Sequence, residues 1–380
     1  MSRATNTGEP GLGLLVIWSS EQSMRDGLLQ HARTLFDVRR VHAVRWTPAL
    51  VAANCARLNR AGIQPPPGPG DPGPLLVVTV FGAPSSDPVA ALRQRAGAPA
   101  QVHPSLSPPA AARDLMLLLG TDPVAHLASC PGPWDGRVEE VSRDLTGAQG
   151  WSSGNELFRA LDHTVRYVVL RNFEQVPESL HVGSHEDVDL LTDDYEDIVR
   201  VLNPRRHPRC IPSTGGPHWV RINGKDVWFD LRFVGDDYYD PQWARRLLDG
   251  RVWNPRGFFA PNDEDYFESL AYHTIVHKRV FAPDYGPRLA AMARAAGRAG
   301  DDAAALHDPA RVKQEVDAIL ARRGFRYCRP RDVNVFYNFE AIGHRWPRMQ
   351  RKLAGLTRKA MRVVHRLRRR SAAAPALDAR

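Results

Sequence analysis

The chain has 380 residues, of which 43% are hydrophobic and 24% are charged, a composition typical of a globular protein with two or three domains. It has no run of about 18 apolar residues and no signal-peptide core, which argues against a membrane-spanning helix. Its four cysteines form no CxxC pair, which argues against a zinc ribbon and a disulfide scaffold. Together these features favour a cytoplasmic location. The net charge of +9 is concentrated in eleven Lys/Arg between Arg345 and Arg370, so the remainder carries −2 and does not indicate a nucleic-acid-binding body.

Residues 1–120 are expected to form a small parallel α/β domain. Apolar strands alternate with segments whose apolar residues recur at helical spacing, and strands are predicted at 12–18, 38–46 and 75–82. We expect Ser19 or Ser20 to cap the first helix, and Thr47 to cap the second with Pro48 in its first turn. The segment contains no glycine-rich phosphate loop, so we assign no chemistry to it.

Residues 121–150 are interpreted as a connector, and a second domain is predicted over 151–260. Its expected elements are a helix at 154–164, strands at 165–173 and 186–192, a helix at 193–203 and a hairpin at 218–235. Asp193 or Asp194 is a candidate cap of the second helix. Asn223-Gly224 lies between alternating apolar residues, which is the strongest short-range signal of a two-residue hairpin turn.

Residues 261–343 are predicted to be a helical subdomain, followed by a basic tail at 344–380. His273 and His277 are four residues apart on one predicted helix, without an HExxH motif. We therefore favour a hydrogen-bonded, packed His273 over a metal-binding pair. The tail is expected to be either a solvated helix or a helix on anionic lipid, because aromatic residues typical of an RNA-binding arm are almost absent.

Three aspartates interrupt apolar strands of the second domain. Asp187 and Asp189 are two residues apart in one predicted strand, so their side chains project from the same face. Asp230 lies in the hairpin among Trp228, Phe229, Leu231 and Phe233. Neighbouring carboxylates repel each other unless they are protonated or bind a cation, and magnesium prefers oxygen ligands. This pattern predicts a magnesium or manganese site, with capping or turn roles for the aspartates as the alternative.

The order DxD, helix, then a lone aspartate in a hairpin resembles the polymerase-β-like nucleotidyltransferase superfamily over residues 155–280. The stretch "HEDVDLL" is especially similar to the aminoglycoside-nucleotidyltransferase branch. The resemblance implies an α+β catalytic domain with a helical C-terminal part. It also implies two metal ions, one held by Asp187, Asp189 and Asp230 and one held by the first two. Asp230 is then the candidate general base for an acceptor hydroxyl.

The phosphate-binding part departs from the family pattern, which places Gly-Ser or Gly-Gly at the end of the strand that precedes DxD. Here Arg171 and Asn172 occupy that place, while Gly183 and Ser184 stand only two residues before Asp187. Either pair is a candidate phosphate ligand, because Arg171 is able to form bidentate bonds with a phosphate. Two further cations complete the set of candidate substrate-binding residues, namely Arg232 and Lys278.

These features predict a transferase that moves a nucleotidyl group from a nucleoside triphosphate to a hydroxyl of a small molecule or glycan precursor. Nucleic acid is not an expected partner, because the core lacks the positive charge that a polynucleotide requires. One alternative is the related LicD-like phosphotransferase branch of cell-surface polysaccharide synthesis, which uses a CDP-activated donor. The basic tail would then hold the enzyme at the inner membrane face. The other alternative is a catalytically inactive binding module with the same fold.

Overall fold

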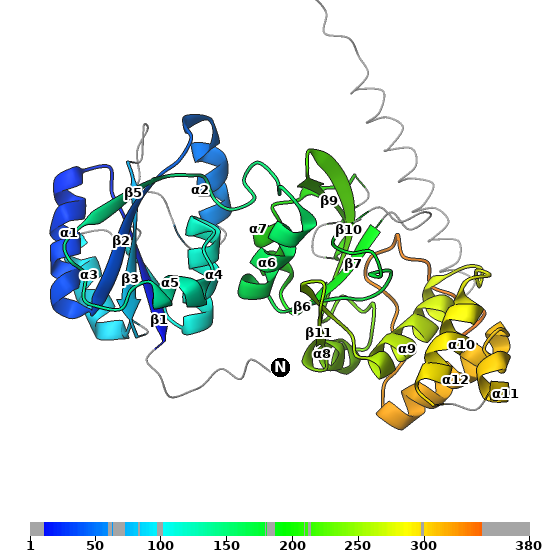
Figure 1. The fold of residues 1–380 in the computed structure, drawn as a ribbon. Helices are drawn as coiled ribbons and strands as arrows, with labels where there is room; N and C mark the ends of the chain where they lie inside the picture. Colours follow the sequence, from blue (N-terminus) through cyan, green and yellow to red (C-terminus); the bar gives the residue numbers. More distant parts are fainter. Residues whose placement is uncertain are drawn as a thin grey trace, which may run out of the picture. The chain divides into compact units, whose positions relative to one another are not determined.

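The structure is a computed structural model in which the chain divides into two compact units. It describes residues 11–59, 63, 73–82, 84–96, 102–178, 180, 187–208, 210–211, 214–297 and 300–343. The first unit comprises Met1–Arg205, His218–Val234 and Arg251–Ala260, and the second comprises Arg206–Pro217, Gly235–Gly250 and Pro261–Arg380. Among the helices of the described ranges, none combines the length and apolar character needed to cross a bilayer. The architecture is mixed α/β, as the sequence predicted at that level (Figure 1).

The first unit contains a five-stranded sheet of order β4-β1-β3-β2-β5. Its strands are β1 (Leu12–Trp18), β2 (Val38–Arg45), β3 (Leu75–Phe81), β4 (Val102–Ser105) and β5 (Val138–Ser142). β1 pairs antiparallel with β3 and β4, β2 pairs antiparallel with β3, and β5 pairs parallel with β2. The prediction of a parallel sheet is therefore wrong. Strands covered on both faces are apolar throughout whatever their direction, so the sequence pattern does not distinguish the two arrangements.

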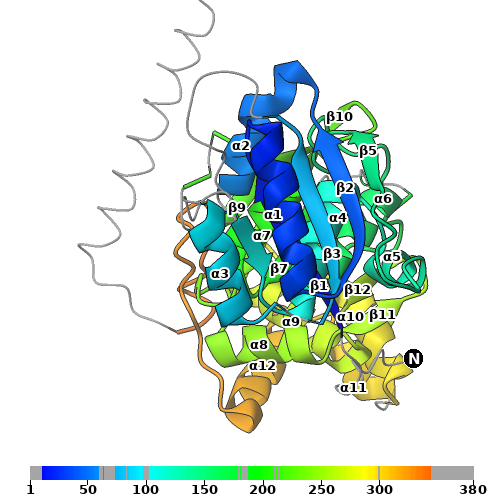
Figure 2. The same cartoon turned by 90° about the vertical axis from the view of Figure 1, so that its left-hand side faces the viewer.

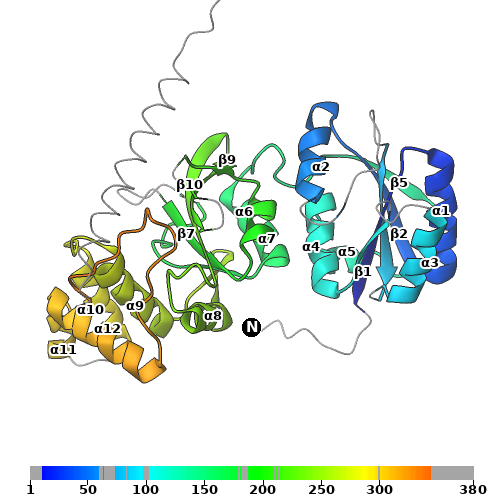
Figure 3. The ribbon, with the colours of Figure 1, turned by 180° about the vertical axis from the view of Figure 1, so that it is seen from behind.

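Helices cover both faces of this first sheet. α1 (Gln22–Leu35) and α3 (Ser86–Ala96) pack on one face, and α2 (Val51–Asn59) and α4 (Pro108–Leu119) pack on the other (Figures 2 and 3). The predicted connector supplies α5 (Pro123–Ala128) and the edge strand β5. β5 has the sequence VEEVS and is half-exposed, so it lacks the apolar run that identifies the central strands.

The predicted helix caps of this region are only partly correct. α1 begins at Gln22 after Glu21, without a side-chain cap, and Ser19 instead accepts a hydrogen bond from the Glu21 amide at 3.2 Å. Pro48 does begin a short 3-10 helix, η1 (Pro48–Leu50), ahead of α2. Thr47 makes no side-chain capping bond there, and its hydroxyl donates a 2.7 Å hydrogen bond to Asp144. Neither predicted residue therefore makes a capping hydrogen bond with its side chain, although Thr47 does occupy the N-cap position of η1.

A second sheet has the order β6-β7-β10-β9-β8, and most of its residues belong to the first unit. Its strands are β6 (Tyr167–Val169), β7 (Asp187–Thr192), β8 (Arg205–Arg206), β9 (Gly216–Ile222) and β10 (Lys225–Phe233). Asn223 and Gly224 both have positive φ, at 47° and 71°, which fits the predicted two-residue turn between β9 and β10. A two-stranded ribbon, β11 (Val252–Asn254) with β12 (Phe258–Ala260), packs beside β6.

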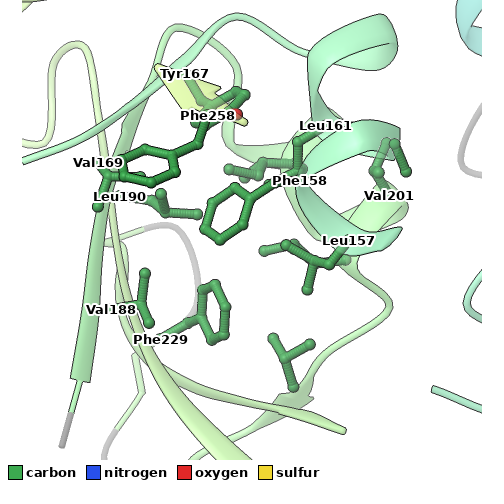
Figure 4. Close-up of a cluster of buried hydrophobic side chains, with 14 of the residues drawn as sticks. Leu157, Phe158, Leu161, Tyr167, Val169, Val188, Leu190, Val201, Phe229 and Phe258 are labelled. Carbon is green, nitrogen blue, oxygen red and sulfur yellow. The ribbon is translucent and has the colours of Figure 1, made fainter. Parts of the chain in front are cut away.

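Helices α6 (Gly154–Thr164) and α7 (Tyr195–Leu202) form one hydrophobic core with this second sheet (Figure 4). Asp194 caps α7 by accepting a 3.0 Å hydrogen bond from the Asp197 amide, which confirms one of the two predicted caps. The core contains Leu157, Phe158, Leu161, Val169, Val188, Leu190, Val201, Phe229 and Phe258. Only one face of β7 and β10 enters this core, so their opposite face is available for polar side chains.

The described residues of the second unit are mainly helical after residue 260. They form α9 (Asp263–Tyr272), a π-helical turn η3 (His273–His277), α10 (Tyr285–Ala295), α11 (Gly300–Ala305) and α12 (Pro309–Arg323). α8 (Pro241–Asp249) precedes them. The basic tail at 344–380 lies outside the described residues.

Candidate metal centre

The three predicted aspartates converge because β7 and β10 are parallel neighbours. Asp189 pairs with Asp230 in the strand register, and Asp187 pairs with Trp228. Residues that alternate with them point into the core instead, namely Val188, Leu190 and Phe229 (Figure 4). Leu231 belongs to the same hydrophobic cluster. Alternation along each strand and pairing between the strands therefore place all three carboxylates on the sheet face away from the core.

The carboxylates are close enough to share one cation. One oxygen from each of Asp187, Asp189 and Asp230 lies within 4.8 Å of the others. A search of the described residues for three or more Asp, Glu, His or Cys side chains with ligand atoms this close together finds these three aspartates. Asp189 is 1% exposed, whereas Asp187 and Asp230 are half-buried. The arrangement presents one buried carboxylate with two more accessible ones beside it.

Two buried arginines lie beside the carboxylates. Arg171 forms an ion pair with Asp189, and Arg232 donates to both carboxylate oxygens of Asp230 at 2.8 and 2.7 Å. Burial raises the pKa of Asp189 to about 8; Arg171 opposes this shift, and the charges of Asp187 and Asp230 add to it. The pKa remains raised because the positive charge of Arg171 does not offset burial and the two like charges.

The predicted substrate-binding residues lie in different parts of the structure and make different contacts. Arg171 follows β6 and contacts a carboxylate, while Asn172 adopts a left-handed conformation with φ 56°, which asparagine tolerates better than most residues. Arg232 shares the face of Asp230 as predicted. Lys278 belongs to the second unit, where its carbonyl oxygen accepts a 3.4 Å hydrogen bond from Asn338. Gly183 and Ser184 lie outside the described residues.

His273 and His277 are packed, hydrogen-bonded side chains, as the sequence favoured. His273 Nδ1 is 2.8 Å from the Tyr238 hydroxyl, and His277 Nε2 is 3.1 Å from the Tyr238 carbonyl oxygen. The rings of Tyr238 and His277 stack with their centroids 4.0 Å apart. Both histidines are 5% exposed. These contacts indicate a structural role in the aromatic core of the second unit.

Two tryptophans near the carboxylates were not predicted as site residues. Trp228 alternates with Phe229 on β10, and Trp219 alternates with Val220 on β9, so both point away from the core. Both are half-buried. Alternation within the hairpin sequence "HWVRINGKDVWFDLRF" was the signal that placed them on the face of Asp230.

The chain matches no protein-family model, no curated protein and no solved structure. The functional argument therefore depends on the geometry of the site.

A buried pair of histidines lies where α5 meets the first sheet, and neither residue was predicted to take part in chemistry. His126 on α5 is 2.9 Å from the Thr79 hydroxyl, and its ring centroid is 5.6 Å from that of His42. His42 faces Glu139, which forms a bidentate ion pair with Arg40 at 2.7 and 2.8 Å. Burial lowers the pKa of His126 to about 4; the neighbouring His42 and Arg40 lower it further, and Glu139 opposes them. His126 is thus neutral at pH 7.

Acid should therefore destabilise the first sheet through His126. The folded-state pKa lies below the ordinary value of 6.5, so between pH 6.5 and 4 the unfolded chain binds more protons and stability falls as pH falls. The full loss from this group is about 3 kcal/mol. Thermal unfolding measured from pH 7 to 4.5 should show a smaller decline for His126→Gln than for the wild type. His31→Gln, on α1, should follow the wild type; equal declines in all three proteins would contradict the prediction.

Proposed function

We propose that this protein is a magnesium- or manganese-dependent nucleotidyltransferase that transfers a nucleotidyl group from a nucleoside triphosphate to a hydroxyl of a small molecule or glycan precursor. The observation that carries the proposal is the convergence of Asp187, Asp189 and Asp230 within 4.8 Å on adjacent parallel strands. The order of these residues along the chain adds the resemblance to the polymerase-β-like superfamily.

The residues at the site fit a divalent cation. Their oxygens are the hard ligands that magnesium and manganese prefer. The three carboxylates outnumber the two arginines beside them, so negative charge remains for a cation to neutralise. Burial of Asp189 beside two other carboxylates is unfavourable without a cation, as the raised pKa of Asp189 indicates. Bound cations in such a site neutralise phosphate charge and lower the pKa of an attacking hydroxyl.

In this proposal, different side chains of the site bind the cations, accept the proton and orient the proton acceptor. Asp187 and Asp189 would hold the cations from one strand, and Asp230 would join them from the neighbouring strand. Asp230 is half-buried and so retains access to an acceptor hydroxyl, whose proton it accepts at a carboxylate oxygen. Arg232 fixes the orientation of Asp230 through its two hydrogen bonds. Arg171, which pairs with Asp189, would exchange this carboxylate partner for a phosphate oxygen when the donor binds.

Calorimetric titration with Mn²⁺ and each nucleoside triphosphate tests this function. The wild type should bind at least one triphosphate only when Mn²⁺ is present. Asp189→Asn should lose that binding, because it removes the central carboxylate of the cluster. A wild type that binds no triphosphate in the presence of Mn²⁺ would rule the proposal out.

The side chain of Arg171 favours a second candidate, a LicD-like phosphotransferase. Arg171 occupies the place where nucleotidyltransferases carry small Gly-Ser residues, and it pairs with Asp189. Such an enzyme would bind a CDP-activated donor more tightly than any free triphosphate, and adding these donors to the titration separates the two reactions. A protein that binds the cation but neither kind of donor would instead be a catalytically inactive module.

A further inference from the structure

A polar groove lies among three helices of the second unit. It is lined by one side of α8, the start of α9 and the region where α12 ends. Its volume is about 540 Å³, within the range of about 300–1,000 Å³ that is usual for small-molecule sites. Apart from Gly250 and Phe325, every residue that lines it has a polar or charged side chain. The groove therefore favours a ligand that forms many hydrogen bonds over an apolar one.

Hydrogen bonds hold the polar groups of this groove in place. Asp265 is 1% exposed, and its two carboxylate oxygens accept hydrogen bonds from Arg246 at 2.9 Å and from Asn262 at 2.7 Å. Asn262 also donates to the Gly250 carbonyl oxygen at 3.0 Å. A Cβ at Gly250 would lie 2.8 Å from the Asp265 carboxylate, so the network needs glycine at this position. The groove is thus ordered before a ligand binds, which reduces the entropic cost of binding.

The charges of the groove neutralise one another. Arg246 and Arg323 both form ion pairs with Glu264, at 3.0 and 2.5 Å. Each has a second partner, which is Asp265 for Arg246 and the buried Glu268 for Arg323. An anionic ligand would have to compete with these carboxylates. A guanidinium has five N–H donors, so the two ion pairs of Arg246 still leave donors for an uncharged ligand. These contacts favour a neutral polar ligand over a phosphate or a carboxylate.

Two further side chains contribute an amide and an aromatic ring. Gln242 is exposed, and its amide group both donates and accepts hydrogen bonds. Phe325 lines the groove and stacks on the buried ring of Trp243, with ring centroids 5.4 Å apart and 14° between the planes. Sugars carry hydroxyls that donate and accept hydrogen bonds, and their C–H groups contact aromatic rings favourably. The groove offers a partner for both kinds of group.

We propose that this groove binds a neutral saccharide. The saccharide hydroxyls would bond to the side chains of Gln242, Arg246 and Asp265, and its C–H groups would contact Phe325. All lining residues belong to the second unit, whereas the carboxylate cluster belongs to the first, so the inference does not depend on the proposed transfer reaction. Binding should accordingly require neither a divalent cation nor a nucleotide.

Saturation-transfer difference NMR and calorimetric titration with glucose, maltotriose, cellotriose and chitotriose test the proposal, in EDTA and without nucleotide. The wild type should bind at least one of these sugars. Gln242→Leu should weaken that binding about 2- to 12-fold, as expected for the loss of a hydrogen bond. Phe325→Leu should also weaken it, because the ring is removed. Gln314→Leu makes the same change at an exposed position of α12 outside the groove and should bind as the wild type.

Melting temperatures show whether the variants fold, and Gln242→Leu carries the test if Phe325→Leu does not. A wild type that binds none of the four sugars would overturn the proposal. Wild-type affinity in Gln242→Leu would overturn it too, because the sugar would then bind elsewhere. Loss of sugar binding in Asp189→Asn would place the sugar at the carboxylate cluster, against the groove. Inorganic phosphate that binds the wild type but not Gln242→Leu, without sugar binding, would make the groove an anion site instead.

Discussion

Asp187→Asn and Asp189→Asn are each expected to lower turnover at least about 100-fold, because even residues that only orient metal ligands contribute about 10- to 100-fold. Each substitution replaces a carboxylate of the cluster with a neutral amide of almost the same shape. Pyrophosphate release should be measured with the triphosphate that binds most tightly and a panel of sugar acceptors. Circular dichroism should show that the variants keep the wild-type secondary structure.

Asp193→Asn provides the matched control for these variants. Asp193 directly follows β7, which carries both aspartates, but it is 3.9 Å from Arg166 and is not part of the carboxylate cluster. Its turnover should remain within about twofold of the wild type, as is usual for surface substitutions of small energetic effect. Near-normal turnover in both Asp187→Asn and Asp189→Asn would refute a catalytic role for the cluster.

Mg²⁺ or Mn²⁺ is expected to raise the melting temperature of the first unit. The cation binds the folded arrangement of Asp187, Asp189 and Asp230, which the unfolded chain lacks, and it relieves their mutual repulsion. At a concentration 100 times the dissociation constant, the gain is about 2.7 kcal/mol. That gain corresponds to a rise of about 5–10 °C for a domain of 150–250 residues. Differential scanning calorimetry at increasing Mn²⁺ concentrations measures it.

The same titration on variants assigns the effect to the site. Asp189→Asn should show little or no rise, whereas Asp193→Asn should retain the full rise. Potassium chloride at matched ionic strength controls for general screening of surface charges. A rise of equal size in Asp189→Asn and the wild type would show that the cation binds elsewhere.

Local patterns in the sequence predicted the parts of the fold that depend on near neighbours. The turn at Asn223-Gly224 and the Asp194 cap of α7 follow from residues a few positions apart, and both are present. The direction of β3 between β1 and β2 was not predictable in this way. Its apolar run is the same for a parallel and an antiparallel strand, and the choice depends on contacts between distant segments.

In the candidate site, too, features set by near neighbours in the sequence were predicted and contacts between distant residues were not. Strand alternation predicted that Asp187 and Asp189 share a face, and the hairpin predicted where Asp230 lies. The ion pair of Arg171 with Asp189 joins residues on opposite sides of the 181–186 segment, so spacing alone did not distinguish it from a phosphate contact. The same alternation places Trp228 on the face of Asp230. A tryptophan in a strand is equally typical of a hydrophobic core, so this pattern alone did not identify it as a neighbour of the site.

The pairing of Asp189 with Asp230 in the strand register limits which insertions and deletions the chain can tolerate. Deleting one codon between Gly224 and Asp230 would turn Asp230 toward the apolar interior and bring Phe229 and Leu231 onto the polar face that carries the carboxylates. Such a chain would lose both the carboxylate cluster and part of its hydrophobic core. Length variation among descendants of this gene should therefore accumulate in the connection between β8 and β9 rather than within β7 or β10.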